Sequence, residues 1–220
     1  PAEWRVLDPL CRVTISRFYR DRSVFQSLER EVLPRLARNT GARGGRVLRC
    51  WSVGCASGEE PYTLAMLWRF AVKRRFPGIG LQIIATDPDE GMLERAWAGC
   101  YPASSLWELP EDRVRRGFTR RGKLYCIRDI VKADVEFRAQ DVRRTMPDGP
   151  FDLVLCRNIV FTYFDEELQR QIMKEFRQRI VPGGILVTGV HEPLPLEKEG
   201  FIPLPGTRGI YLSVEQDQDA

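Results

Sequence analysis

Histidine is nearly absent from this chain of 220 residues, which contains His191 alone. The six cysteines include no Cys-x-x-Cys pair. Zinc sites draw most of their ligands from clusters of these two residue types. The sequence therefore predicts no metal site.

Long apolar runs are also lacking. No segment approaches the roughly 18 consecutive apolar residues that a transmembrane helix needs. The chain opens on Pro1 and a polar stretch, which does not resemble the apolar core of a signal peptide. Cys50 and Cys156 lie in apolar runs, where a thiol usually serves as a small buried hydrophobe. Reduced thiols and the missing signal peptide together predict a cytoplasmic protein.

Neither sign of charge is in large excess, because 34 lysines and arginines face 30 acidic residues and the net charge is +4. We expect neither a nucleic-acid partner nor insertion into a membrane. A basic cluster lies between residues 113 and 123. It is either a solvated face or a docking surface for an acidic partner.

Apolar runs typical of buried parallel strands alternate with stretches of helical periodicity. The predicted strands lie at residues 46–53, 81–86, 135–139, 151–156, 184–189 and 209–213. The predicted helices lie at residues 24–36, 61–74 and 166–179. This alternation predicts βαβ units with right-handed crossovers. The expected fold class is therefore α/β, with a doubly wound, mostly parallel sheet.

One region interrupts the alternation. Residues 102–133 are rich in charge and turn formers, and they contain short β-like runs at 123–127 and 130–131. We predict a small β-subdomain inserted here. The expected organisation is an N-terminal segment and helix at 1–40, a core domain at 41–213 that carries this insertion, and an acidic tail at 214–220.

The first predicted strand runs directly into Gly54-Cys55-Ala56-Ser57-Gly58, followed by Glu59 and Glu60. Glycines at a strand-to-helix turn allow a ligand to approach the backbone closely. A dinucleotide would place its pyrophosphate at this helix start, where the two carboxylates would repel it. A cationic sulfonium compound suits the two acids better. A capping box formed by Ser57 and Glu60 is the purely structural alternative.

The second predicted strand ends at Asp87. A carboxylate at this place can accept hydrogen bonds from both ribose hydroxyls of an adenosine. The alternative is a helix cap within Asp87-Pro88-Asp89-Glu90, for which Asp89 is the better candidate.

With these motifs in order, the sequence resembles the CheR family of chemotaxis receptor methyltransferases. The resemblance covers residues 12 to 213. It includes Thr14 to Asp21, the run Ser57-Gly58-Glu59-Glu60-Pro61-Tyr62, Ala85 to Asp89, Cys156-Arg157-Asn158 and Pro182-Gly183-Gly184. The family transfers methyl groups from S-adenosylmethionine to glutamate carboxylates of receptors, so the resemblance implies this cofactor and a class I methyltransferase fold.

The resemblance also implies individual site residues. It places the catalytic arginine, which also contacts the cofactor, at Arg20, and a second catalytic residue at Tyr163. The other cofactor contacts fall on Thr14, Ser16, Gly54, Glu60, Asp87, the adenine-flanking pair Asp141 and Val142, and the pair Asn158 and Ile159. No residue is implied as a metal ligand.

The chain departs from the family pattern in several places. Thr14 and Ser16 stand where the family often has Asn and Thr, and Asp141 replaces a commoner Asn. Gly189-Val190-His191-Glu192 differs from the family's Gly-His-Ser-Glu, and one extra residue precedes Tyr163. By this resemblance we expect the chain to carry the catalytic domain without the helical domain that precedes it in the family. Residues 102–133 correspond to the small subdomain through which some members bind receptor tails.

Three functions follow from these features. The first is methylation of a carboxylate oxygen, that of a protein glutamate. A carboxylate is already ionised at neutral pH, so this reaction needs no general base. The second is methylation of a small molecule on the same fold. The third is a non-enzymatic module that binds S-adenosylmethionine and signals through a partner.

Overall fold

The computed structural model describes residues 16–192, 194 and 200–214. Its centre is a seven-stranded sheet in which five neighbouring strands, β6, β2, β1, β7 and β8, run parallel. The last two strands, β10 and β9, are antiparallel. In spatial order the strands are β6 (Val135–Ala139), β2 (Gly80–Asp87), β1 (Val47–Val53), β7 (Phe151–Cys156), β8 (Ile180–Val187), β10 (Ile210–Ser213) and β9 (Phe201–Pro203).

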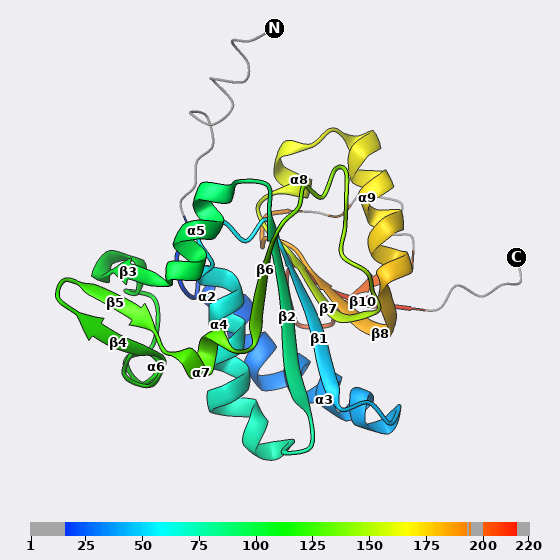
Figure 1. Cartoon of the computed structure of the whole chain (residues 1–220). Helices are drawn as coiled ribbons and strands as arrows, with labels where there is room; N and C mark the ends of the chain where they lie inside the picture. The colour runs from blue at the N-terminus through cyan, green and yellow to red at the C-terminus, as the bar shows by residue number, and fades with distance from the viewer. Residues whose placement is uncertain (1–15, 193, 195–199, 215–220) are drawn as a thin grey trace, which may run out of the picture.

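Helices cover both faces of this sheet, because alternate residues of each strand point to opposite sides. Leu48 and Cys50 of β1 belong to a core with the N-terminal helices and α4, whereas Trp51 and Val53 belong to a second core with α9. The helical segments are α2 (Arg22–Ser27), the π-helical turn η1 (Leu28–Val32), α3 (Leu33–Ala42), α4 (Glu59–Leu67), η2 (Trp68–Val72), η3 (Lys73–Arg75), α5 (Glu90–Ala98), η4 (Ala103–Ser105), α6 (Glu111–Gly117), α7 (Asp129–Lys132), α8 (Val160–Tyr163) and α9 (Glu166–Arg179). The predicted fold class is confirmed (Figure 1).

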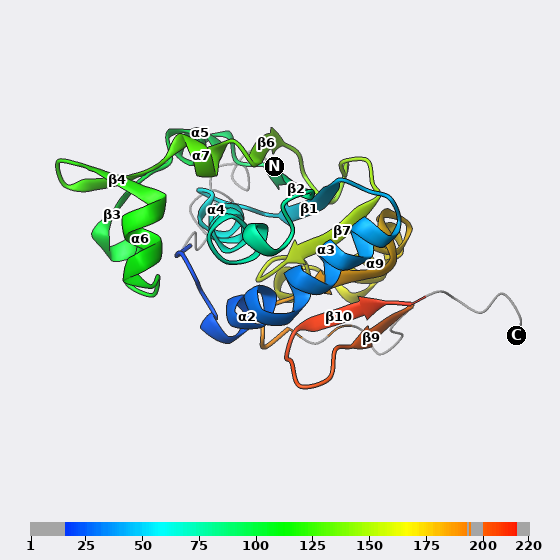
Figure 2. The ribbon, with the colours of Figure 1, turned by 90° about the horizontal axis from the view of Figure 1, so that it is seen from below.

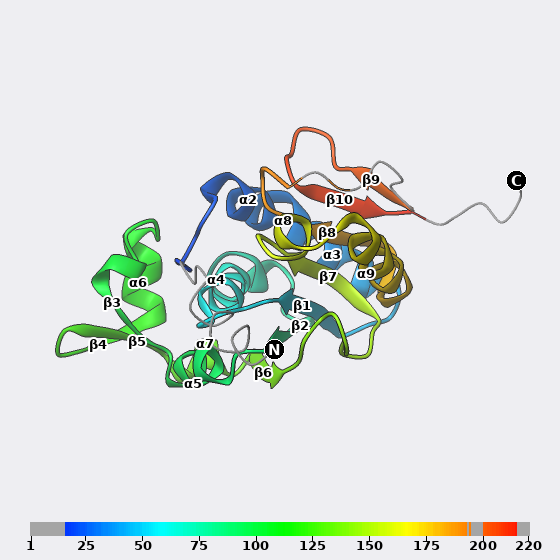
Figure 3. The ribbon, with the colours of Figure 1, turned by 90° about the horizontal axis from the view of Figure 1, so that it is seen from above.

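A second, three-stranded antiparallel sheet lies apart from the first, in the order β3 (Cys100–Pro102), β5 (Leu124–Ile127) and β4 (Phe118–Arg121). Figures 2 and 3 show it on the far side of α4 from the large sheet. The predicted β-like run at 130–131 is wrong, because these residues lie in α7, with Asp129 in the first helical turn and Val131 buried. Two apolar neighbours are too few to distinguish a strand from a helix.

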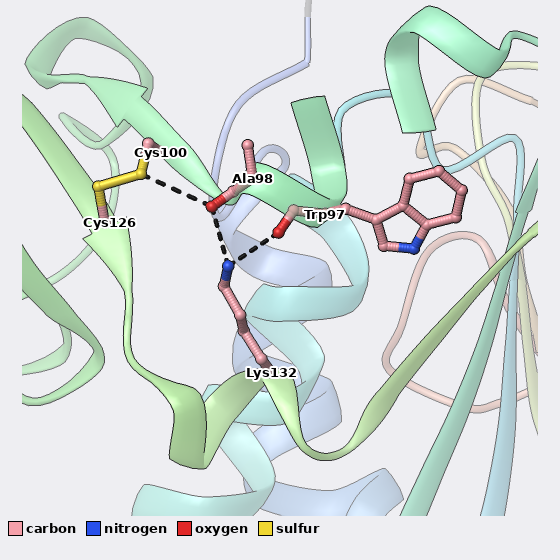
Figure 4. Close-up of a disulfide and its surroundings, with 5 residues drawn as sticks. All are labelled: Trp97, Ala98, Cys100, Cys126 and Lys132. Carbon is pink, nitrogen blue, oxygen red and sulfur yellow. Dashed lines mark hydrogen bonds between the residues drawn. A yellow bond between two sulfur atoms is a disulfide. The ribbon is translucent and has the colours of Figure 1, made fainter. Parts of the chain in front are cut away.

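Cys100 and Cys126, which oppose each other on β3 and β5, are joined by a disulfide. The expectation that all cysteines are reduced is therefore wrong for this pair, whereas Cys50, Cys55 and Cys156 are free and buried. Figure 4 shows the disulfide beside the end of α5, where the Lys132 ammonium donates to the carbonyls of Trp97 and Ala98 at 2.8 Å each. The lysine thereby satisfies carbonyls that the helix end leaves without intrahelical partners.

No helix in the described part of the chain is long and apolar enough to cross a membrane.

Candidate functional site

A cavity of about 430 Å³ opens at the carboxyl ends of β1, β2 and β7. This is the edge at which open α/β sheets bind their ligands. Its walls come from the loop after β1, the ends of β2 and β6, the segment after β7, and residues 16–20 ahead of α2. Its size lies within the range of about 300–1,000 Å³ that is usual for small-molecule sites.

The loop between β1 and α4 turns through three left-handed residues, Gly54, Ala56 and Gly58. A side chain at Gly54 would place its Cβ 2.5 Å from Ile159 Cδ1, which lines the same cavity. The amide of Cys55 donates to the carbonyl of Thr86 at 3.0 Å and so fastens this loop to β2. The glycine at 54 therefore keeps backbone, and not a side chain, at the cavity wall.

Asp87 braces the loop with both carboxylate oxygens. One oxygen accepts from the amide of Ala56 at 2.8 Å, and the other accepts from the amide of Asp89 at 2.9 Å. Asp87 is not the helix cap, because Asp89 caps α5 by accepting from the amide of Met92 at 3.1 Å. Each carboxylate oxygen has two lone pairs, so Asp87 can still accept from a ligand in the cavity that it lines.

Glu60 faces the same cavity from the first turn of α4. Its carboxylate accepts from the Ser52 hydroxyl at 2.8 Å and from the Arg157 guanidinium at 2.9 Å. The capping box is not formed, because Gly58 is the N-cap of α4 and makes no side-chain cap. Ser57 instead donates to the carboxylate of Glu59.

Glu59 is the buried member of the acidic pair and is only 2% exposed. Burial raises the pKa of its carboxyl above the usual range. Hydrogen bonds from its own backbone amide and from the side chains of Ser57 and Ser16 oppose this rise only in part. Glu59 therefore lies behind the cavity wall and braces the loop, whereas Glu60 presents its charge to the cavity.

The segment ahead of α2 closes one side of the cavity with Ser16, Arg17 and the exposed Arg20. Phe18 anchors the segment to the small subdomain, since its amide donates to Ser105 O at 3.1 Å and its ring packs edge-on against Tyr101 at 4.8 Å. Thr14, the other predicted contact here, lies outside the described residues.

The loop after β6 contributes Asp141 and the buried Val142. The Asp141 carboxylate accepts from the Arg143 side chain, with distances of 2.9 Å from Nε and 2.6 Å from Nη2. This contact holds the pKa of Asp141 below its usual range. The family resemblance implied an adenine contact at Asp141, and the structure adds that an arginine already pairs with this acid.

The segment after β7 contributes Asn158, Ile159 and Tyr163 to the wall. Asn158 has a left-handed backbone, and its amide donates to Glu192 at 2.7 Å. The same Glu192 oxygen accepts from the amide of Gly189 at 2.7 Å. Tyr163 is 66% exposed and lies at the rim.

Every predicted site residue within the described part of the chain lines this one cavity. Residues that the sequence reasoning missed include Arg157, Arg143, Gln140, Met92 and Phe164, which line it as well. A charged residue directly after a fully buried strand was the available signal for Arg157. The hydrogen bond from the backbone amide of Asn158 to Glu192 could not be predicted, because the two residues are 34 positions apart in the sequence.

The chemistry of the wall fits S-adenosylmethionine. Two carboxylates, Glu60 and Asp87, lie near the start of α4, where a pyrophosphate would meet repulsion and a sulfonium with an ammonium group meets attraction. Asp87, Val142 and Ile159 line the same cavity, so its wall combines a carboxylate with apolar side chains. No group of three or more potential metal ligands occurs among the described residues.

Comparisons with known proteins agree with this geometry. The family model described as "CheR methyltransferase, SAM binding domain" matches residues 14–210. The chemotaxis protein methyltransferase of Listeria monocytogenes is 34% identical over 84% of this chain and 67% of its own length. Chemotaxis protein methyltransferase 1 of Pseudomonas aeruginosa is 36% identical over 80% of this chain and 65% of its own length.

A much longer relative also matches. An uncharacterized 104.1 kDa protein of Rhodobacter capsulatus is 33% identical over 90% of this chain, which covers 21% of that protein. The chain thus spans about two thirds of the length of the two named methyltransferases and a fifth of the third relative. These matches confirm the resemblance drawn from the motifs, together with the cofactor class.

Proposed function

Since the chain belongs to the CheR family of S-adenosylmethionine-dependent methyltransferases, we propose that it transfers a methyl group to a glutamate carboxylate oxygen of an acceptor protein. The observation that supports this most strongly is the gathering of Arg20, Glu60, Asp87 and Tyr163 around one cavity at the carboxyl edge of the sheet. The proposed acceptor is a chemoreceptor, as the names of the relatives suggest.

Bound S-adenosylmethionine would supply an electrophilic methyl group on a positively charged sulfur. Glu60 attracts the cationic end of the cofactor, and Asp87 orients the ribose. The remaining contacts are assigned to Thr14, Ser16, Gly54, Asp141, Val142, Asn158 and Ile159. Their combined role is to hold the cofactor in one orientation toward the acceptor. In a displacement of this kind, such positioning accounts for much of the reduction in the activation free energy.

Arg20 and Tyr163 are the proposed catalytic residues. An ionised carboxylate needs no base, so the side chains at the mouth of the cavity act by orientation. The fixed fork of the Arg20 guanidinium suits a carboxylate acceptor, and it would hold the nucleophilic oxygen in line with the methyl group. Tyr163, exposed at the rim, is placed to contact the acceptor.

The organisation and location of the protein are proposed together. Residues 41–213 form the methyltransferase domain with an insertion at about 102–133, and residues 1–40 lead into it. The cytoplasm is the proposed compartment, and the disulfide between Cys100 and Cys126 departs from the reduced thiols that are usual there.

The test uses S-adenosylmethionine that carries tritium on its methyl group, with the signalling domain of a Listeria monocytogenes chemoreceptor as acceptor. Methyl esters of carboxylates are cleaved by base and release volatile tritiated methanol, whereas N-methyl groups are not. Base-released methanol that depends on this chain supports the proposal. Transfer only to metabolites in an extract would favour a small-molecule methyltransferase. Tight cofactor binding with no transfer to any acceptor would favour the signalling module.

A further inference from the structure

Arg157 is a buried charge at the point where β7 ends, and its side chain is only 3% exposed. One nitrogen, Nη1, donates to Glu60 at 2.9 Å. The other, Nη2, donates to the Asp21 carboxylate at 2.6 Å and to the backbone carbonyl of Arg20 at 2.9 Å. One side chain therefore joins the acid of the cofactor cavity to the segment that carries Arg20.

The backbone of this segment is unusual on both sides of Arg20. Tyr19 and Asp21 have φ angles of 65° and 60°, in the left-handed region that residues other than glycine rarely adopt. Such conformations persist only where the surroundings fix them. Tyr19 is held by its ring, stacked on Phe25 at 5.5 Å, and by its amide, which donates to the Thr63 hydroxyl at 3.3 Å.

The left-handed backbone of Asp21 directs its carboxylate away from the helix that it precedes. It is the N-cap of α2, a place where an aspartate side chain usually accepts from the first free amides of the helix, yet it makes no such bond. Its left-handed backbone turns the carboxylate toward Arg157 instead. The Arg157 guanidinium also lies over the ring of Phe25, 5.1 Å from its centroid, on the helix that Asp21 begins.

We infer that Arg157 is a positioning residue for methyl transfer: it fixes residues 19–21, and with them the side chain of Arg20, relative to Glu60 in the cofactor cavity. This inference rests on the proposed function for its catalytic consequence. The holding of the segment follows from the contacts alone. A guanidinium is required, because it reaches a carboxylate on either side and a carbonyl with one planar fork, whereas an ammonium offers a single point of charge.

The first measurement is hydrogen exchange at the amides of residues 19–25 in the ligand-free protein. In Arg157→Lys the charge stays and the bridge is lost, so local opening becomes easier, and exchange should accelerate by about tenfold. Asp21→Asn removes the charge from one arm of the bridge and should act in the same direction. Arg69→Lys is the matched control. Arg69 also donates through two nitrogens to a largely buried carboxylate, that of Asp134, and neither residue lines the cavity.

The second measurement separates turnover from cofactor binding, with the tritium assay and with titration of S-adenosylhomocysteine. Displacement of a reacting group by about 1 Å can cost roughly a hundredfold in rate, so kcat of Arg157→Lys should fall by about 10- to 100-fold. The Michaelis constant for S-adenosylmethionine and the Kd for S-adenosylhomocysteine should change by less than about fivefold. The double variant with Asp21→Asn should lose little more than the single variants, because both break one bridge.

Unchanged exchange in both Arg157→Lys and Asp21→Asn would overturn the inference, and so would equal losses of turnover and cofactor affinity. If the wild type methylates nothing, the proposed function fails, and the exchange measurement still decides whether Arg157 holds the segment. If Arg157→Lys does not fold, Asp21→Asn carries the same test, since its side chain is 26% exposed and the substitution keeps its size.

Discussion

Asp87 combines two tasks in one side chain, since it braces the cofactor loop and lines the cavity. Asp87→Ala should weaken S-adenosylhomocysteine binding by about a hundredfold or more, because two hydrogen bonds to a charged group contribute roughly 1.5–3 kcal/mol each. Isothermal titration measures this loss.

Asp165→Ala is the matched control for Asp87→Ala. Asp165 caps α9 by accepting from the amide of Leu168 at 2.9 Å, and it does not line the cavity. Its loss should cost about 1 kcal/mol of stability with the Kd unchanged. If Asp87→Ala behaves in the same way, Asp87 is a loop brace and not a ribose ligand.

The buried carboxyl of Glu59 makes stability depend on pH. Because its pKa is raised in the folded protein, the native state holds this proton more tightly than the unfolded state does. Stability is therefore lost as the pH rises from the usual pKa of a glutamate through the raised one. Glu59→Gln removes this loss, so the melting temperature of the variant relative to the wild type should increase as the pH rises above about 4.5.

Glu136 provides the control of opposite sign for Glu59→Gln. Glu136 is exposed beside Arg138, which lowers its pKa, so its contribution is present above the usual pKa and is lost as the pH falls. The melting temperature of Glu136→Gln relative to the wild type should change only weakly with pH and in the opposite direction, as expected of a surface ion pair. Parallel curves for the two variants would contradict the assignment of Glu59.

Arg20 distinguishes an enzyme from a sensor. Its positive charge does not attract a sulfonium, so its proposed partner is the acceptor carboxylate. Arg20→Ala should therefore lower kcat with tritiated S-adenosylmethionine by more than it weakens S-adenosylhomocysteine binding. Equal losses would make Arg20 a cofactor clamp. A partner protein that responds to cofactor occupancy without any methyl transfer would favour the sensor.

Single residues were predictable where their neighbours in sequence carry the information. Gly54 and Asp87 follow directly after predicted strands, and Glu60 lies in the first turn of the helix that follows Gly54. The parallel topology then brings all three together at one cavity. Arg157 belongs to the motif Cys156-Arg157-Asn158, but the sequence indicates no role for it, because its partners Asp21 and Glu60 come from distant segments. Charge alone does not reveal which of several acids an arginine will join.

At the scale of elements, Gly58 sets how α4 enters the core. It has a φ of 89°, and an added Cβ would lie 3.0 Å from Ala96 Cβ and 3.1 Å from the ring of Phe137. Gly58→Ala should lower the free energy of unfolding through both backbone strain and overpacking. Gly44→Ala is the control, because Gly44 has a similar φ of 74° and open space around it.

Chemical denaturation measures both glycine variants. The difference between them isolates the packing part, for which we expect about 1–3 kcal/mol. Equal losses in the two variants would show that α4 and α5 can separate to admit a methyl group.

The predicted elements agree with the structure where burial alone determines the pattern. The run 151–156 is buried at every position and matches β7, and the periodicity of 166–179 matches α9. Short elements escaped this reasoning: α6 and α8 carry too few residues to display a period, and residues 130–131 were assigned to the wrong class. Contacts with the small sheet position α6, and contacts with α4 position α7.

At the scale of the whole molecule, the cavity is lined by segments that lie far apart in the sequence. Residues 16–20 reach it from one side and are attached to the small subdomain through Phe18, and to the end of β7 through Arg157. The small sheet is thus connected to the active edge of the large sheet by a short segment. We expect substitutions in the subdomain that loosen Phe18 to disturb the segment around Arg20, although they lie away from the cavity.

The disulfide between Cys100 and Cys126 has a further consequence for the integrity of the chain. With this bond closed, the intervening residues form a covalent ring, and the exposed hairpin with Arg121 and Lys123 lies within it. A trypsin cut at either residue therefore opens the ring without dividing the molecule. The cut protein should run as one species on a gel without reductant and as two fragments after reduction, whereas Cys100→Ser should give two fragments in both gels.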